Sequence, residues 1–137
     1  MDTLAYQILL LKADFQKYCL KELKPWGISR GLLFFVIYIG NHPGCFLKEM
    51  AEVLQVDAGY TTRAIMQLSA LELVVRKANE QDKRQKCLYL TEKGTLAFER
   101  MFRLFQEWDA HVTKGWTEQE REVCKKILQS MVMQTKE

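Results

Sequence analysis

Residues 47–72 read LKEMAEVLQVDAGYTTRAIMQLSALE, and this stretch decides the fold. Its first eight residues predict a short helix over residues 47–54, because their apolar side chains share one helical face. These side chains are Leu47, Met50, Ala51 and Leu54. Three residues then lead to a second helical pattern over residues 58–72, for which Asp57 is the predicted N-cap. Two helices joined by so short a link have the spacing of a helix-turn-helix.

The second of these helices has two distinct faces when it is plotted at about 100° per residue. Its inward positions are Thr61, Ala64, Ile65 and Leu68, and its outward positions are Gly59, Thr62, Arg63, Met66, Gln67 and Ala70. Arg63 has the donor geometry for guanine and Gln67 for adenine. The small surfaces of Thr62, Met66 and Ala70 fit thymine methyl groups. The outer face therefore fits a helix that reads the major groove, although an ordinary solvated helix face has a similar composition.

A basic hairpin is predicted directly after this helix. Residues 73–78 and 86–90 have the pattern of two short strands, and residues 79–83 form a polar turn between them. Residues 74–86 hold five of the 20 basic residues and only two of the 17 acidic ones, so they account for the whole net charge of +3. The basic residues are Arg76, Lys77, Lys83, Arg84 and Lys86, and the acidic ones are Glu80 and Asp82.

Such a local excess of positive charge indicates a contact with a polyanion. Lys77, Lys83 and Lys86 would neutralise phosphates, and Arg84 would enter a narrow, electronegative minor groove. A solvated β-turn is the alternative for the hairpin considered alone. Its position next to the helix-turn-helix favours a wing.

Four further helices are predicted around this unit. The first spans residues 3–24, and the second spans residues 30–41, with Ser29 as its cap and an apolar surface all round that requires burial. A long helix follows the hairpin from residue 92 to about residue 114, capped by Thr91, and the last one begins at a capping box formed by Thr117 and Glu120.

The fold class is therefore mainly α with a small β-hairpin wing, in the order α-α-α-α-β-β-α-α. The 137 residues suffice for a single domain over residues 1–137. Within it, residues 28–94 form the predicted winged helix-turn-helix DNA-binding lobe. Residues 1–27 and 95–137 form the predicted helical region on either side of it.

Composition and motifs exclude several other classes. The most apolar stretch spans eight residues, 32–39, which is well short of the roughly 20 that cross a bilayer, and the N-terminus has no secretory pattern. We expect a cytoplasmic protein with reduced cysteines, without membrane contact and without a cofactor. Phosphate-loop, H-E-x-x-H and G-x-S-x-G motifs are absent, so no enzyme is predicted. His42 and His111 lack the spacing of metal ligands.

Five segments between Leu47 and Gly94 resemble the MarR family of transcriptional regulators. They read LKEMAEVL, DAGYTTR, LVVRK, DKR and LYLTEKG. The resemblance implies a homodimer whose first and last two helices interlock, so that residues 1–27 and 95–137 form a helical dimerisation region. It also implies that two winged lobes bind successive major grooves of a pseudo-palindromic operator in double-stranded DNA, most often as a repressor.

The resemblance also implies roles for individual residues. Thr62 and Arg63 would read bases, Asp82 would orient neighbouring arginines, Arg84 would enter the minor groove, and Thr91 and Gly94 would be structural. The full set of expected DNA contacts is Gly59, Tyr60, Thr62, Arg63, Met66, Gln67, Lys77, Asp82, Lys83, Arg84 and Lys86. The chain departs from the family pattern at Phe46, Ala58, Gly59 and Glu72, which leaves the base sequence of the operator open.

The signal that would release DNA has two candidates. Family members commonly bind a small aromatic effector between the dimer helices and the lobe, and the residues expected to line such a pocket are Phe15, Tyr18, Trp26, Tyr38 and His42. Some relatives sense peroxide through a thiol in the first helix, where Cys19 stands near Lys17 and Lys21. Core packing of the aromatic residues and an inert thiol are the alternatives.

A winged helix that binds another protein is the competing function. The concentration of positive charge argues against it, because protein interfaces are depleted in charge at their centre and enriched in apolar anchors. A steep fall of duplex affinity with rising salt would distinguish DNA binding from this alternative.

Overall fold

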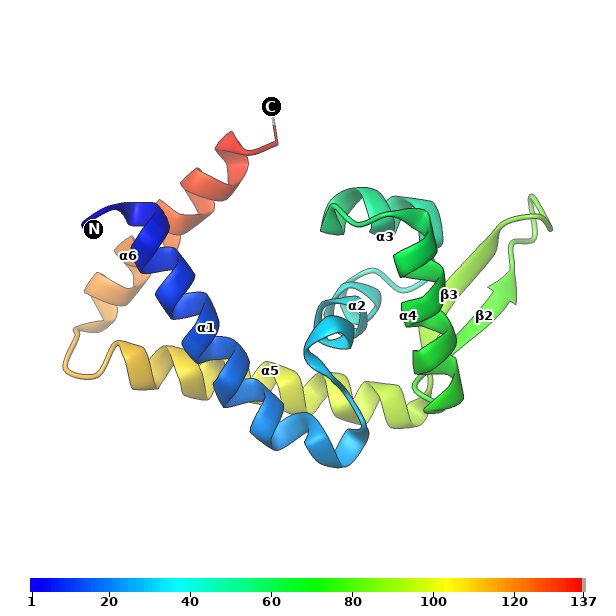
Figure 1. The fold of residues 1–137 in the computed structure, drawn as a ribbon, viewed down its shortest axis with the longest axis horizontal. Helices are drawn as coiled ribbons and strands as arrows, with labels where there is room; N and C mark the ends of the chain where they lie inside the picture. The colour runs from blue at the N-terminus through cyan, green and yellow to red at the C-terminus, as the bar shows by residue number, and fades with distance from the viewer. Residues whose placement is uncertain (137) are drawn as a thin grey trace. The chain divides into compact units, whose positions relative to one another are not determined.

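The computed structural model describes residues 1–136 and confirms the predicted fold class. Helices carry most of the chain, and a small antiparallel sheet forms the wing (Figure 1). In chain order the elements are α1 (Leu4–Leu23), the 3-10 helix η1 (Lys24–Trp26), α2 (Arg30–Asn41), β1 (Cys45–Phe46), α3 (Leu47–Leu54), α4 (Ala58–Ala70), β2 (Val74–Ala78), β3 (Lys86–Leu90), α5 (Glu92–Val112) and α6 (Glu118–Gln134).

The chain divides into two compact units, and the division falls within α5. The first comprises Met1–Leu104 and contains the helix-turn-helix and the hairpin. The second begins at Phe105. The predicted division into a DNA-binding lobe and a dimerisation region remains a prediction.

Helix α2 forms the centre of the first unit. Six of its twelve residues are buried: Leu32, Leu33, Phe35, Val36, Tyr38 and Ile39. The prediction of burial all round is wrong at Phe34, which stays 39% exposed, because the neighbouring elements do not enclose this side of the helix. Ser29 occupies the predicted N-cap position, but its side chain makes no capping hydrogen bond.

The helix-turn-helix packs as its apolar pattern predicts. All four residues assigned to the inner face of α4 are buried: Thr61, Ala64, Ile65 and Leu68. Of the four apolar residues predicted to share one face of α3, Met50 is fully buried, and Leu47, Ala51 and Leu54 are half-buried. The Asp57 carboxylate accepts the N–H of Tyr60 at 2.6 Å and so caps α4 as expected. Helix α4 ends at Ala70 rather than at residue 72, because Glu72 adopts a left-handed conformation with φ of 63°.

The sheet has the strand order β1-β3-β2, so β3 lies in the middle and β2 forms one edge. The hairpin pairs Val74 with Leu90 and Ala78 with Lys86. Strand β1 was not predicted, because two residues are too few to show a period. It pairs Cys45 with Leu88 and thereby joins the start of α3 to the wing. Figure 1 shows the hairpin extending away from the helices of its unit.

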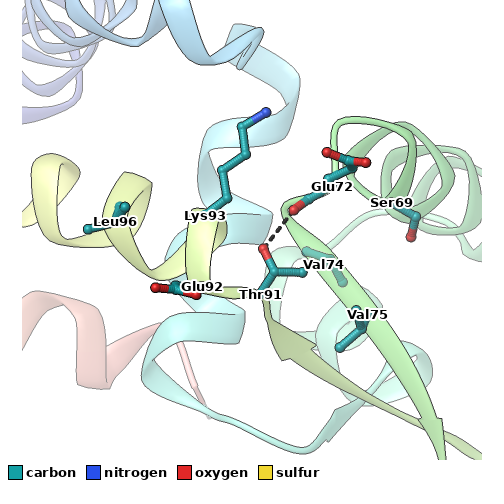
Figure 2. A pocket seen from close by; sticks show the side chains of 8 residues that line it. All are labelled: Ser69, Glu72, Val74, Val75, Thr91, Glu92, Lys93 and Leu96. Atoms are coloured by element: carbon teal, nitrogen blue, oxygen red, sulfur yellow. Dashed lines mark hydrogen bonds between the residues drawn. The ribbon is translucent and has the colours of Figure 1, made fainter.

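Thr91 ties the end of α4 to the start of α5. Its hydroxyl donates to the carbonyl oxygen of Glu72 at 2.6 Å (Figure 2) and accepts the N–H of Gly94 at 2.9 Å. Its own N–H donates to the carbonyl oxygen of Leu73 at 3.0 Å. A Cβ on Gly94 would lie only 2.0 Å from that carbonyl oxygen, so this junction requires a glycine. The hydroxyl and the main-chain N–H of Thr91 thus fix the segment that follows α4 to the start of α5.

In the second unit, α6 begins at the predicted capping box. The Thr117 hydroxyl accepts the N–H of Glu120 at 3.1 Å, and the Glu120 carboxylate accepts the N–H of Thr117 at 2.9 Å. These hydrogen bonds with Thr117 lower the pKa of the Glu120 carboxyl. Gly115, with φ of 87°, makes the turn before the box. Among the described residues, no helix combines the length and the apolar character needed to span a bilayer.

Candidate nucleic-acid interface

The outer face of α4 presents a continuous row of accessible small and polar side chains. All six predicted contact residues on this helix are exposed: Gly59, Tyr60, Thr62, Arg63, Met66 and Gln67. The Thr62 hydroxyl donates to the carbonyl oxygen of Ala58 at 2.9 Å, so its proton is already used within the helix. Thr62 therefore offers its methyl group and its oxygen lone pairs to a partner. This chemistry suits a thymine methyl group or a base amine.

Tyr60, also a predicted contact residue, has a second role in holding α4 against α2. Its hydroxyl donates to the carbonyl oxygen of Gly31 at 3.5 Å, and its ring lies 5.9 Å from the ring of Phe35. A Cβ on Gly31 would lie 2.7 Å from the Tyr60 oxygen, so this contact depends on a glycine in α2. The ring remains 39% exposed, which leaves one edge accessible.

Arg63 extends along the first turn of α4. Its Nη1 atom lies 3.2 Å from the position that a Cβ on Gly59 would occupy. Long side chains in helices lean toward the N-terminus, and residues four apart share a face, so this arrangement follows from helical geometry. The guanidinium therefore lies over the N-terminal turn of the helix.

Asp82 organises the turn of the wing. Its Oδ1 atom accepts the N–H of Arg84 at 3.0 Å and lies 4.0 Å from Nε of the same arginine. Its carbonyl oxygen accepts the N–H of Gln85 at 3.1 Å. The Arg84 side chain is 96% exposed, so it extends into solvent from a turn whose backbone is fixed. Lys83 is exposed beside it.

The strand register divides the basic residues of the wing between its two faces. Alternate residues of a strand point to opposite faces, and directly paired residues share a face. Arg76 pairs with the fully buried Leu88, and Lys86 pairs with Ala78, so both basic residues lie on the face that continues into the core. Lys77 pairs with Cys87 on the other face, where its ammonium lies 5.0 Å from the centre of the Tyr89 ring.

Sequence reasoning grouped Lys77 with Lys86 and omitted Arg76 from the expected contacts. The structure separates the first two and places Arg76 on the face of Lys86. The alternation of side chains along residues 74–78 could have predicted this difference. Once one strand residue is known to be buried, every second residue is assigned to the same face.

The residues expected to line an effector pocket are used in different ways. The Tyr38 hydroxyl donates to Glu49 Oε2 at 2.7 Å, and its ring stacks on His42 at 4.2 Å. Burial, together with the hydrogen bond to Glu49, raises the pKa of the Tyr38 phenol to about 12. The contact with Glu49 joins α2 to α3. The hydroxyl and the ring of Tyr38 thus both have partners within the protein. Phe15, Tyr18 and Trp26 are half-buried in α1 and η1.

Cys19 is fully buried in the C-terminal half of α1. Burial raises the pKa of its thiol to about 11, whereas a reactive thiol needs a lowered pKa and access to solvent. Among the described residues, no three histidine, cysteine or acidic side chains are grouped closely enough to hold a metal ion.

Comparisons with known proteins agree with this geometry. The MarR family model matches residues 28–86. The HTH-type transcriptional regulator BilQ of Clostridium symbiosum is 41% identical over 130 residues, which are 95% of this chain and 90% of that protein. A MarR transcriptional regulator from Methanosarcina mazei Go1 has a TM-score of 0.88 and 27% identity over 96% of this chain and 94% of that structure.

A further solved structure shares the fold and contains nucleic acid. It is a MarR family regulator from Listeria monocytogenes complexed with 26mer DNA, with a TM-score of 0.87 and 23% identity over 98% of this chain and 89% of that one. The motifs between Leu47 and Gly94, the winged helix-turn-helix and these similarities agree, and the chain belongs to the MarR family of transcriptional regulators.

Proposed function

We propose that this chain binds double-stranded DNA sequence-specifically and thereby regulates transcription. The observation that carries the proposal is the exposed outer face of α4 beside a wing with five basic residues, both within one compact unit. A helix of this kind enters the major groove, while a basic hairpin binds phosphates or the minor groove. The DNA-bound Listeria structure with the same fold supports this reading.

Individual residues have distinct roles in this proposal. Arg63 and Thr62 read base edges at the N-terminal end of α4, with Gln67 and Met66 further along the helix. Arg84 enters the minor groove, oriented by Asp82, and Lys83 and Lys86 neutralise phosphates. Arg76 joins Lys86 on its face of the wing. Lys77 contacts a phosphate while its ammonium stays over the Tyr89 ring.

We further propose that the protein acts as a homodimer on a pseudo-palindromic operator. Helix α6 leaves apolar side chains exposed along its length: Val123, Ile127, Leu128, Val132 and Met133. The first turns of α1 do the same with Leu4, Ile8, Leu9, Leu10 and Leu11. Soluble monomers rarely expose so many apolar residues on single helices, so a second copy of the chain is the occupant that we propose. Sedimentation of native protein and of an Ile127→Glu variant tests this point.

Salt-dependent binding tests the proposed DNA function. A randomised duplex library is incubated with the protein, and the affinity for an enriched duplex is then measured over a series of salt concentrations. The logarithm of the binding constant is expected to fall linearly with the logarithm of the salt concentration, because phosphate contacts release counterions. An affinity that is independent of salt, or the absence of any enrichment, would contradict the proposal.

Two variants separate base reading from phosphate binding. Arg63→Ala is expected to relax base preference at a cost of about 1 to 3 kcal/mol, and Arg84→Ala is expected mainly to weaken binding. Lys114→Ala is the matched control, because it removes one exposed positive charge from the second unit, outside the proposed interface. Equal effects of all three variants would show that net charge alone governs binding.

We also propose repression as the output and a small aromatic acid as the releasing signal. A groove of about 570 Å³ between α2 and α5 is lined by Asn41, Phe98, Glu99, Phe102 and Arg103. It combines two aromatic rings with the Arg103 guanidinium, which can pair with an acid, and it also contains the Glu99 carboxylate. It therefore suits such a molecule better than the predicted pocket, because the Tyr38 hydroxyl is already bonded to Glu49 and the Tyr38 ring is already stacked on His42.

Thermal unfolding in the presence of salicylate-like acids tests the effector proposal, since a ligand that binds only the folded state raises Tm. Arg103→Ala should reduce the increase in Tm, and Tyr38→Phe should preserve it. A Tm that none of these acids changes would contradict a small aromatic effector.

A further inference from the structure

Helix α4 has a glycine near its start, at a position that faces outward. A Cβ built on Gly59 would lie 3.2 Å from Nη1 of Arg63 and 3.2 Å from Oδ1 of Asp57. Both distances are shorter than ordinary van der Waals contacts of a Cβ. The arginine head and the capping carboxylate thus already occupy the edges of the space that a side chain at position 59 would enter.

The backbone itself gives no reason for a glycine at this position. Gly59 lies inside a regular α-helix and is not among the residues with positive φ in the described part of the chain. A glycine in a helix destabilises it relative to alanine, and Gly59 is exposed, so close packing against another element does not require it either. The Arg63 side chain instead lies against the space that a Cβ at position 59 would fill.

Charge favours the same position of the arginine. The Asp57 carboxylate borders the same vacant Cβ position as the guanidinium, and opposite charges attract. The carboxylate is held in place because it accepts the N–H of Tyr60 at 2.6 Å. Arg63 is therefore guided onto the first turn of α4, which is the part of a recognition helix that contacts base edges.

We propose that Gly59 is a specificity-determining residue that acts through Arg63. Its missing side chain lets the guanidinium lie over the first turn of α4, where its paired donors face a guanine. A Cβ at position 59 requires the guanidinium to shift by a few tenths of an ångström, and such a shift changes its hydrogen bonds to the base that is read. This inference rests on the proposed DNA-binding function and adds to it a specific control of base preference.

Four proteins test the proposal: the native chain, Gly59→Ala, Arg63→Ala and the double variant. Base preference is determined by selection from a randomised duplex library, and affinity is measured for the duplex that the native chain enriches. Thermal unfolding is recorded in parallel at one protein concentration. The double variant shows whether the two positions act together.

Gly59→Ala is expected to raise Tm, because alanine is the better helix former, and yet to weaken binding to the native duplex. The expected loss is about tenfold, which corresponds to about 1.4 kcal/mol, together with a changed preference at one base position. In the Arg63→Ala background, Gly59→Ala is expected to change affinity by less than about twofold, because the guanidinium is already absent.

Three results would overturn the proposal. One is unchanged affinity and base preference in Gly59→Ala. Another is a tenfold loss that persists in the Arg63→Ala background, since Gly59 would then act without the arginine. The third is a lower Tm of Gly59→Ala, which would show that the fold itself requires a glycine at this position. A native chain that enriches no duplex would instead refute the proposed function, and this inference with it.

Discussion

Replacing Thr91 with valine should uncouple the end of α4 from the start of α5. Valine keeps the shape of threonine but removes the hydroxyl, which donates to the Glu72 carbonyl at 2.6 Å and accepts the Gly94 N–H at 2.9 Å. Loss of a helix N-cap costs about 1 kcal/mol, and loss of the second hydrogen bond costs about 1 kcal/mol more. We therefore expect the free energy of unfolding to fall by about 2 kcal/mol.

Urea unfolding followed by far-UV circular dichroism measures this change. All variants are compared at one protein concentration, because association of subunits contributes to stability. Thr91→Ser retains the hydroxyl and should stay within about 0.5 kcal/mol of the native protein. Thr95→Val is the matched control, because Thr95 is exposed and its hydroxyl makes a local hydrogen bond to the main-chain carbonyl of Thr91, which both Thr91 variants retain. Stability unchanged in Thr91→Val, or an equal loss in Thr91→Ser, would refute this account of the junction.

Three further predictions concern strain and titration. Glu72→Gly should raise the free energy of unfolding by about 0.5 to 1 kcal/mol, because φ is 63° there and glycine adopts this region without strain; a loss in urea unfolding would contradict it. The pKa of the Tyr38 phenol is raised from 10.0 to about 12, so the folded state keeps the phenol neutral at pH values at which the unfolded chain ionises it. The stability difference between the native protein and Tyr38→Phe should therefore shrink as the pH rises from about 10 to about 12. Cys19 should react with a thiol reagent near pH 7 only after unfolding, and peroxide should leave DNA affinity unchanged; rapid labelling of the folded protein would argue for a sensing thiol.

The sequence predicted the helices and the faces of α4 because one physical rule governs both. Burial selects apolar residues at helical spacing, and Thr61, Ala64, Ile65 and Leu68 follow that spacing along the whole helix. The caps at Asp57 and Thr117 were equally predictable, since their side chains bond to backbone groups three residues away.

Features that depend on contacts between distant residues could not be predicted in the same way. Strand β1 exists because Cys45 lies beside Leu88, and two residues carry no periodic signal. Helix α4 ends early at the left-handed Glu72, whose carbonyl accepts a hydrogen bond from Thr91, 19 residues later in the chain. The role of Tyr60 in contacting α2 likewise needs Gly31 across the fold.

The candidate site shows the same limit. Composition placed the positive charge in the hairpin correctly, but only the register assigns Lys77 and Lys86 to opposite faces. The position of the Arg63 guanidinium next to Gly59 depends on the conformation of a long side chain, which the sequence does not specify.

The position of β2 at the edge of the sheet has a consequence for solubility. An edge strand presents free backbone groups to which a strand of another molecule can pair, and this is a route to aggregation. Arg76 and Lys77 stand on opposite faces of this strand, so an incoming strand of a second wing would bring like charges together on either side. Arg76 and Lys77, which we propose to bind DNA, thus also oppose edge-to-edge pairing of two wings while no DNA is bound.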